Sequence, residues 1–252
     1  MLPYDYPKFK ADMEQAILSG RLSQERLDDA VRRVLRVKFN LGLFERQAPL
    51  ISDLGVVGSR AHRELAREAV RRSLVLLKDD SKILPLPKSA SYIVAGSSAD
   101  NVGRQSGGWT IDWQGVDGNP LPGATSILAG IKQALPLGAK IDYDRDGNFN
   151  LTEKAEYGIV IVGEQPYAEG VGDKERPHLS AEDLAVIERV RQLAEKLVVI
   201  IVAGRPLDIR AEARQWDAVI AAWLPGSEGQ GVSDVLFGDY PFTGELPIPW
   251  EL

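Results

Sequence analysis

Apolar residues recur with a helical period in two early parts of the chain, 7–46 and 60–73. Ser23 is placed to cap the main helix of the first part, and Gly42 is placed to end it. Residues 47–59 lack this period and contain Pro and Gly, which predicts a linker. The stripe of the first part consists of Leu27, Val31, Val34, Leu35 and Phe39.

The pattern changes near residue 91, where short β-rich runs begin to alternate with helical stretches. The runs 157–163 and 197–204 are apolar on both faces, which predicts a mostly parallel sheet covered by helices on each side. The segment SLVLLKDD before this region is interpreted as a turn of the chain. The predicted strands are 92–96, 140–144, 157–163, 197–204, 218–225 and 245–250, and the predicted helices between them are 125–135, 181–196 and 228–237. The fold class is therefore α/β.

Ligands of such sheets lie beyond the carboxyl ends of the strands. The segments that follow the predicted strands are rich in Gly and polar residues, and long loops at this position often carry function. They are 97–109, 164–175, 204–206 and 225–231.

Composition excludes several classes of protein. The net charge is −6 with both signs interspersed, which argues against a nucleic-acid partner and against an anionic membrane surface. The absence of cysteine excludes disulfides and thiolate metal sites, and two histidines cannot build a three-histidine zinc centre. We interpret both His62 and His178 as surface or structural residues. No apolar run is long enough to span a bilayer, and MLPYDYPKFK has no features of a signal peptide.

Two further motifs resemble ligand-binding loops. The run GRQSGG lacks the Lys of a phosphate-binding loop, so no nucleotide cofactor is predicted. Residues 142–153 match the spacing of a calcium-binding loop from Asp142 to Glu153. A strand rather than a helix precedes them, and an Asp-Gly turn at a strand end is the preferred interpretation, with a bound calcium ion as the alternative.

The loops after two of the predicted strands contain candidate site residues. Trp109 and Trp113 lie in the Gly-rich run GGWTIDWQG, where an exposed indole could stack on a sugar and a buried one would plug the underside of the loop. We assign the sugar contact to Trp109 and the packing to Trp113. Glu164 ends the buried strand YGIVIVGE and reaches the rim of the sheet. The acidic residues that follow it could raise the pKa of its carboxyl group and make it a proton donor.

Taken together, these motifs resemble the C-terminal half of glycoside hydrolase family 3, in its exo-β-glucanase and β-glucosidase branch. The resemblance covers essentially the entire chain. The runs that carry it are RLDDAVRRVLRVKFNLGLFE, HRELAREAVRRSLVLLKDD, ILPLP, GGWTIDWQG, VGEQPYAEGVGD, AWLPGSEGQGVSDVLFGD and TGELPIPW.

The resemblance implies a (β/α)8-type barrel followed by a mostly parallel six-stranded α/β sandwich. Residues 1–46 then correspond to the helical tail of the barrel domain, 47–59 to a linker and 60–252 to the sandwich. In this branch the barrel supplies an aspartate nucleophile and a second stacking tryptophan. The sandwich supplies a glutamate acid/base that matches Glu164 and a sugar-stacking tryptophan that matches Trp109.

The barrel itself is missing from this sequence. We therefore expect a fragment of a longer retaining β-glucosidase or β-glucanase, inactive alone, or else a subunit that works with a separate barrel chain. The expected partners are a β-glucoside or β-glucan oligosaccharide and the barrel domain, and the family implies a periplasmic or secreted location. The alternative is a non-catalytic carbohydrate-binding module or partner subunit that uses Trp109 and the 164–175 loop.

Overall fold

The computed structural model describes residues 4–45, 51–250 and 252. Its internal contacts divide the chain into two compact units, 1–55 and 56–252. In the first unit, helix α1 spans Tyr6–Leu18 and α2 spans Gln24–Asn40. A 3-10 helix, η1, covers Ile51–Val56 and crosses the boundary between the units. The Ser23 hydroxyl accepts a hydrogen bond from the Arg26 backbone N–H, which confirms the predicted cap of α2.

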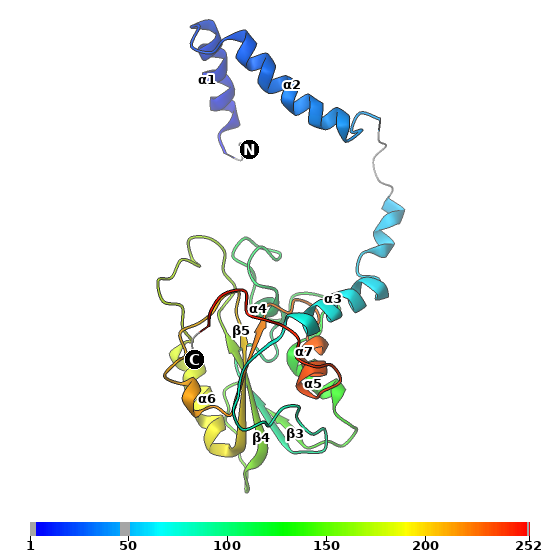
Figure 1. Cartoon of the computed structure of the whole chain (residues 1–252), viewed down its shortest axis with the longest axis vertical. Coiled ribbons are helices and arrows are strands. Elements are labelled where there is room, and N and C mark those ends of the chain that lie inside the picture. The colour runs from blue at the N-terminus through cyan, green and yellow to red at the C-terminus, as the bar shows by residue number, and fades with distance from the viewer. Residues whose placement is uncertain (1–3, 46–50, 251) are drawn as a thin grey trace. The chain divides into compact units, whose positions relative to one another are not determined.

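The second unit contains a six-stranded sheet in the order β1-β6-β5-β4-β2-β3, shown in Figure 1. All neighbouring strands are parallel except β1, which runs antiparallel to β6. The strands are β1 (Val75–Asp79), β2 (Tyr92–Ala95), β3 (Ile141–Tyr143), β4 (Ala155–Gly163), β5 (Ala194–Val202) and β6 (Ala218–Trp223). The predicted mostly parallel six-stranded α/β fold is confirmed.

One strand is not the predicted one. Residues 245–250 form no strand in the described structure. The sixth strand of the sheet is instead β1, which lies within SLVLLKDD, the segment that we interpreted as a turn. Pro247 and Pro249 explain the first error, because proline has no N–H for a strand ladder. The apolar run of Val75, Leu76 and Leu77 explains the second, since it pairs at an edge of the sheet and needs only one partner.

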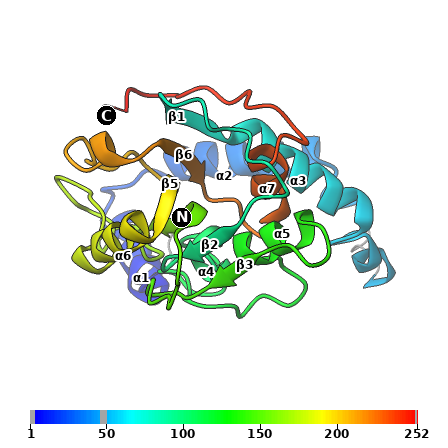
Figure 2. The same cartoon turned by 90° about the horizontal axis from the view of Figure 1, so that it is seen from below.

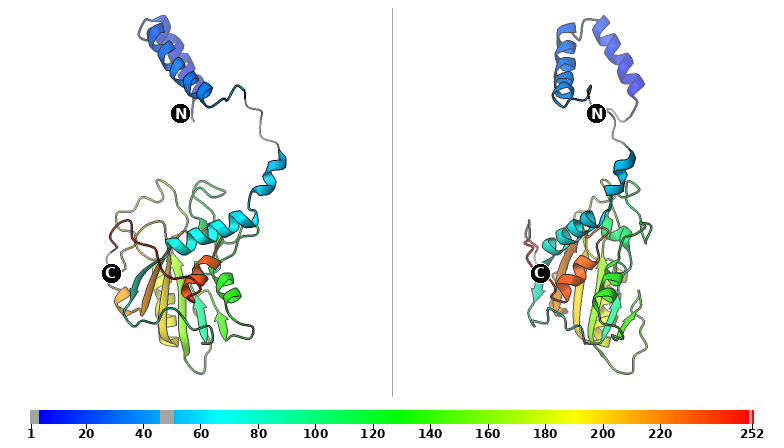
Figure 3. Two further views of the ribbon diagram at one scale, coloured as in Figure 1. Left: turned by 45° about the vertical axis from the view of Figure 1, so that its right-hand side comes forward. Right: turned by 90° about the vertical axis from the view of Figure 1, so that its right-hand side faces the viewer.

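Helices cover both faces of this sheet, as Figures 1 and 2 show. One face packs against α3, α5 and α7 through side chains such as Ile159 and Ile161, and the other packs against α6 through Val160 and Val162. Successive β4 side chains thus pack against helices on opposite faces of the sheet, which is why this strand is apolar along most of its length. The helices are α3 (Arg60–Ser73), α4 (Val102–Ser106), α5 (Ile127–Ala134), α6 (Ala181–Leu193) and α7 (Gln230–Leu236), with a short 3-10 helix η2 (Ala213–Gln215). Figure 3 shows α3, α5 and α7 gathered on the same side of the sheet.

The order of the strands locates the site. From β2 the chain steps outward to β3, then returns to β4 on the other side of β2 and continues through β5 to β6. The direction of winding therefore reverses between β2 and β4. In open α/β sheets this reversal opens a crevice at the carboxyl ends of the strands, which is where ligands bind.

Candidate active site

Glu164 is the first residue after β4, directly at this crevice. Its backbone N–H donates to the Val202 carbonyl oxygen over 3.2 Å, so the pairing with β5 extends to the residue itself. Gly163 allows this approach, because a Cβ atom there would lie 1.8 Å from the Val202 carbonyl oxygen. The side chain is buried, with 3% of its surface exposed.

The surroundings of this carboxylate differ from the expectation. Acidic neighbours were expected, but cations make the contacts. Arg205 donates from Nη2 to Oε1 over 2.8 Å and from Nε to Oε2 over 3.0 Å. Lys174 donates to Oε1 over 3.3 Å. Any proton-donor role of Glu164 has to operate with these two cations against the carboxylate.

Arg205 and Tyr167 enclose the carboxylate further. The guanidinium carbon lies 4.3 Å from the centre of the Tyr167 ring. Burial raises the pKa of the Tyr167 phenol, and the nearby charge of Glu164 adds to the shift because it disfavours a second anion. A neutral phenol therefore remains beside Glu164.

The tryptophan loop lies against the same cavity. A hollow of about 170 Å³ is lined by Gly107, Gly108, Glu164 and Tyr167, among others. It joins the loop after β4 to the loop that carries both tryptophans, and both loops rise from the same end of the sheet (Figure 1). A larger neighbouring cavity of about 530 Å³ also includes Glu164. The structure thus brings the predicted acid and the predicted sugar-stacking loop together.

The two tryptophans are both accessible. Trp109 is 72% exposed and Trp113 is 50% exposed, so Trp113 does not plug the underside of the loop as predicted. Their ring centres lie 6.4 Å apart at an angle of 54°. The backbone at Trp109 and at Ile111 has positive φ angles of 59° and 66°. Such conformations are costly for residues with a Cβ atom, and they occur most often at binding sites.

Two other carboxylates near the cavity have their own partners. Glu169 accepts hydrogen bonds from its own backbone N–H and from the Trp113 and Trp109 side chains, which together hold the pKa of its carboxyl group below the usual range. Burial raises the pKa of Asp183, which accepts hydrogen bonds from the Ser97 side chain and the Gly163 backbone. Asp183 also donates its backbone N–H to the Ser180 hydroxyl, which caps α6. It thereby joins α6 to the ends of β2 and β4.

The remaining sequence motifs give no further site. In the 142–153 loop, Asp144 accepts hydrogen bonds from the backbone N–H groups of Asp146 and Asn148 over 3.0 and 2.9 Å, as in an Asp-Gly turn. Within the described residues, no group of three or more His, Asp or Glu side chains is close enough together to hold a metal ion. His62 and His178 are exposed. No helix in the described part of the chain has the length and hydrophobicity needed to cross a membrane.

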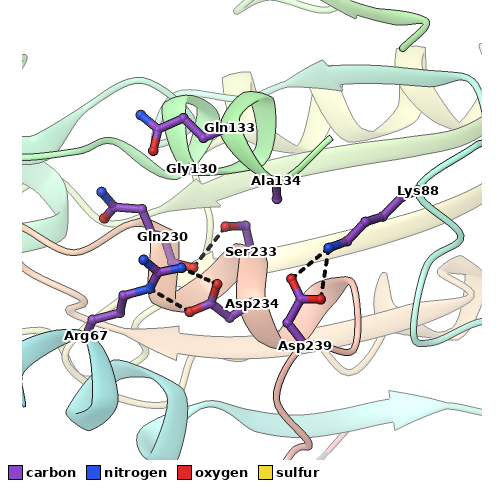
Figure 4. A pocket seen from close by; sticks show the side chains of 9 residues that line it. All are labelled: Arg67, Lys88, Gly130, Gln133, Ala134, Gln230, Ser233, Asp234 and Asp239. Atoms are coloured by element: carbon purple, nitrogen blue, oxygen red, sulfur yellow. Dashed lines mark hydrogen bonds and ion pairs between the residues drawn. The ribbon is translucent and has the colours of Figure 1, made fainter. Parts of the chain in front are cut away.

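A separate hollow of about 370 Å³ shares no residue with the cavities at Glu164 (Figure 4). Its charged side chains are paired with one another. Arg67 binds Asp234 over 2.5 and 2.7 Å, and Lys88 binds Asp239 over 2.7 and 2.8 Å. The Arg67–Asp234 pair joins α3 to α7, and each of the four charged side chains of this hollow has an ion-pair partner.

Comparison with known proteins agrees with this architecture. Residues 74–252 match the Glycosyl hydrolase family 3 C-terminal domain. The chain belongs to glycoside hydrolase family 3. It is 33% identical to the periplasmic beta-glucosidase of Salmonella typhimurium, with 92% of this chain and 35% of the relative aligned. It is 28% identical to the lysosomal beta glucosidase of Dictyostelium discoideum, over 99% of this chain and 33% of the relative.

Solved structures of the family have the same fold. The exo-1,3/1,4-beta-glucanase of a Pseudoalteromonas species, solved as a point mutant, superposes with a TM-score of 0.88 at 38% identity and covers 99% of this chain and 42% of its own. The beta-glucosidase from Listeria innocua, as a point mutant in complex with laminaribiose, gives 0.76 at 26% identity over 90% of this chain and 32% of its own. The chain spans about a third of the length of the curated relatives that it matches. Residues 74–252 are therefore a family 3 C-terminal domain, and the relatives include β-glucosidases, β-xylosidases and an exo-β-glucanase.

Proposed function

We propose that this chain supplies the acid/base half of a retaining, exo-acting β-glucosidase or β-glucanase that hydrolyses terminal β-D-glucosidic bonds. The observation that carries the proposal is the placement of Glu164. This buried carboxylate follows a central strand at the reversal point of the sheet, in a cavity whose other wall is the Trp109 loop. A proton donor beside an aromatic sugar platform is the arrangement that cleavage of a glycosidic bond requires.

The other half of the chemistry would come from a barrel domain, as in the family. A retaining mechanism needs a second carboxylate about 5–5.5 Å from the first, and an aspartate of the barrel is the family's nucleophile. Glu164 would protonate the departing glycosidic oxygen while the aspartate attacks the anomeric carbon. It would then take a proton from the water that hydrolyses the glycosyl-enzyme. Trp109 would stack on the leaving sugar.

Release of nitrophenol from an aryl β-glucoside tests this proposal. We expect no turnover above a Glu164→Ala control from the 252 residues alone, and turnover when the chain is joined to a family 3 barrel domain. Turnover by the chain alone at a rate that Glu164→Ala abolishes would contradict the requirement for the barrel. An active two-domain protein in which Glu164→Ala has no effect would contradict the assignment of the acid.

The exposed indoles favour a second candidate function, a carbohydrate-binding module or partner subunit without catalysis. Trp109 and Trp113 offer accessible aromatic surface on this chain itself. Under this alternative, laminari- or cello-oligosaccharides change the indole NMR signals of both residues, and no barrel domain confers hydrolysis. Binding together with hydrolysis in the joined protein would favour the enzyme.

We propose a periplasmic or secreted location for the whole protein. Similarity to a periplasmic and a lysosomal β-glucosidase supports this location. Immunodetection in separated cell fractions tests it, and recovery only with the cytoplasmic fraction would contradict it.

A further inference from the structure

Arg205 follows β5 in the run AGRP and makes contacts with three parts of the loop that carries Glu164. Its guanidinium group binds both carboxylate oxygens of Glu164, lies over the ring of Tyr167, and donates from Nη1 to the Gly172 carbonyl oxygen over 2.6 Å. One side chain thus fixes the start, the middle and the end of this loop. Only the planar fork of arginine can make these contacts at once.

Three acceptor sites of the Glu164 carboxylate are engaged. An ionised carboxylate offers about four lone-pair sites. Arg205 fills two and Lys174 fills one, and Oε1 accepts from both cations. A glycosidic oxygen can therefore reach Oε1 only if one of these donors withdraws.

The donors differ in how firmly they are held. Lys174 makes the longest of the measured contacts, 3.3 Å, and 48% of its side chain is exposed. Arg205 is bidentate at 2.8 and 3.0 Å with 24% of its side chain exposed. Breaking two charge-assisted bonds costs more than breaking one long one. Lys174 is the donor that substrate can displace, while Arg205 stays in place.

We propose that Arg205 is the positioning residue of this site. It orients the Glu164 carboxylate and keeps a permanent positive charge against it through the reaction. The substrate displaces Lys174 from the carboxylate. The inference rests on the proposed function of Glu164 as the acid/base. Its consequence is a defined pH dependence, since a fixed cation favours loss of the acid's proton.

Other charged groups line the same space and bear on that dependence. Their contributions are common to all the variants compared below. They are Arg104 of α4, Arg145 after β3, His178, and the α6 carboxylates Glu182 and Asp183.

The test measures kcat/KM against pH for a disaccharide, in the chain joined to its barrel domain. Arg205→Met is expected to move the alkaline limb of the profile upward by about one pH unit or more, because the acid keeps its proton longer without the cation. Arg205→Lys keeps the charge but loses the fork. Its limb should stay near the wild-type position while kcat falls about 10–100-fold through misplacement of the carboxylate. Lys174→Met is the matched control. It should move the limb less than Arg205→Met does and lower kcat less than Arg205→Lys does.

If Arg205→Met loses activity at every pH while the alkaline limb of its kcat/KM profile stays in place, Arg205 has only a structural role. That result would overturn the proposal. So would an equal or larger limb shift in Lys174→Met. If Arg205→Met does not fold, Arg205→Lys decides: unchanged kcat overturns the positioning role.

A second measurement separates this inference from the proposed function. The side-chain carboxyl carbon of Glu164 is titrated by ¹³C NMR in the 252-residue chain, with no substrate present. A higher midpoint in Arg205→Met supports the contact even if the joined protein has no glucosidase activity, in which case the proposed function fails on its own. An unchanged midpoint overturns the inference whatever the activity.

Discussion

The indole N–H of Trp109 donates to the Glu169 carboxylate over 3.3 Å and so joins the two loops of the site. Gln114 strengthens the junction, because its side chain accepts from the Ala168 backbone N–H over 2.9 Å. These hydrogen bonds tie the Trp109 loop to the loop that follows Glu164. Glu169, the acidic residue nearest to Glu164 in the sequence, accepts the Trp109 hydrogen bond at this junction.

Glu164→Ala tests the acid directly in the joined protein. Loss of a general acid matters most for poor leaving groups, so hydrolysis of a disaccharide should slow by about 10²–10⁴-fold. Glycosylation by dinitrophenyl glucoside should change far less, and added azide should restore turnover and give a β-glucosyl azide. Glu169→Ala is the matched control. Leaving-group dependence and azide rescue in Glu169→Ala, but not in Glu164→Ala, would show that we have assigned the wrong acid.

Trp109→Ala should weaken the binding of oligosaccharides to the joined protein by about 1–3 kcal/mol, because a stacked aromatic ring and its burial are lost. Isothermal titration calorimetry with laminaritriose measures this change. Glu169→Gln keeps the ring but weakens its hydrogen bond, so a smaller loss is expected. If Trp109→Ala lowers only the thermal stability and leaves the affinity intact, the ring serves packing rather than sugar binding.

Gly108→Ala should separate the two loops. A Cβ atom at this position would lie 2.0 Å from the Tyr167 carbonyl oxygen, so the backbone itself must move. A displacement of about 1 Å near a catalytic group can cost about 10²-fold in kcat. Gly170→Ala is the control in the acid loop, with a φ of +83° and no neighbouring atom within 4 Å, so it adds backbone strain without a clash. Equal kcat losses in both variants would contradict the role of loop contact.

Asp234 should be central to the stability of the contact between α3 and α7. Burial alone would raise the pKa of Asp234, but hydrogen bonds from Arg67 and Arg71 outweigh burial and hold this pKa below the usual range. Removing one partner from a buried ion pair leaves the other charges uncompensated, so Asp234→Ala should lower the free energy of unfolding by about 2–3 kcal/mol in urea. The control is Asp239→Ala in the same hollow. Its pair with Lys88 is more exposed, and a loss of about 1 kcal/mol or less is expected.

The pH dependence of that stability has a definite sign. A carboxyl group whose pKa is lowered by folding stabilises the folded state above the unfolded pKa, and this contribution disappears as pH falls through the folded pKa. The wild-type protein should therefore lose stability below about pH 4 more steeply than Asp234→Ala does. Parallel curves for the two proteins would show that these ion pairs contribute nothing to acid sensitivity.

The sequence was sufficient for the buried strands and the placement of Glu164, because an uninterrupted apolar run such as YGIVIVG has few other interpretations in an α/β chain. It was insufficient for β1, whose pairing with β6 depends on contacts between residues more than a hundred positions apart. It also misjudged the electrostatics of the site. The acids near Glu164 in the chain were visible, whereas Arg205 is distant in sequence and reaches the carboxylate only because β4 and β5 are neighbours.

The pairing of β4 with β5 continues through Gly163 and Val202, the last residues of both strands. Amide protons along these central strands should be among the slowest to exchange with solvent, since opening them requires the sheet to come apart. Any rearrangement that frees Glu164 must then arise in side chains and in the loops beyond the strands, without breathing of the sheet itself. Exchanging residues 165–175 between family members would accordingly alter how the acid is presented while leaving the scaffold beneath it unchanged.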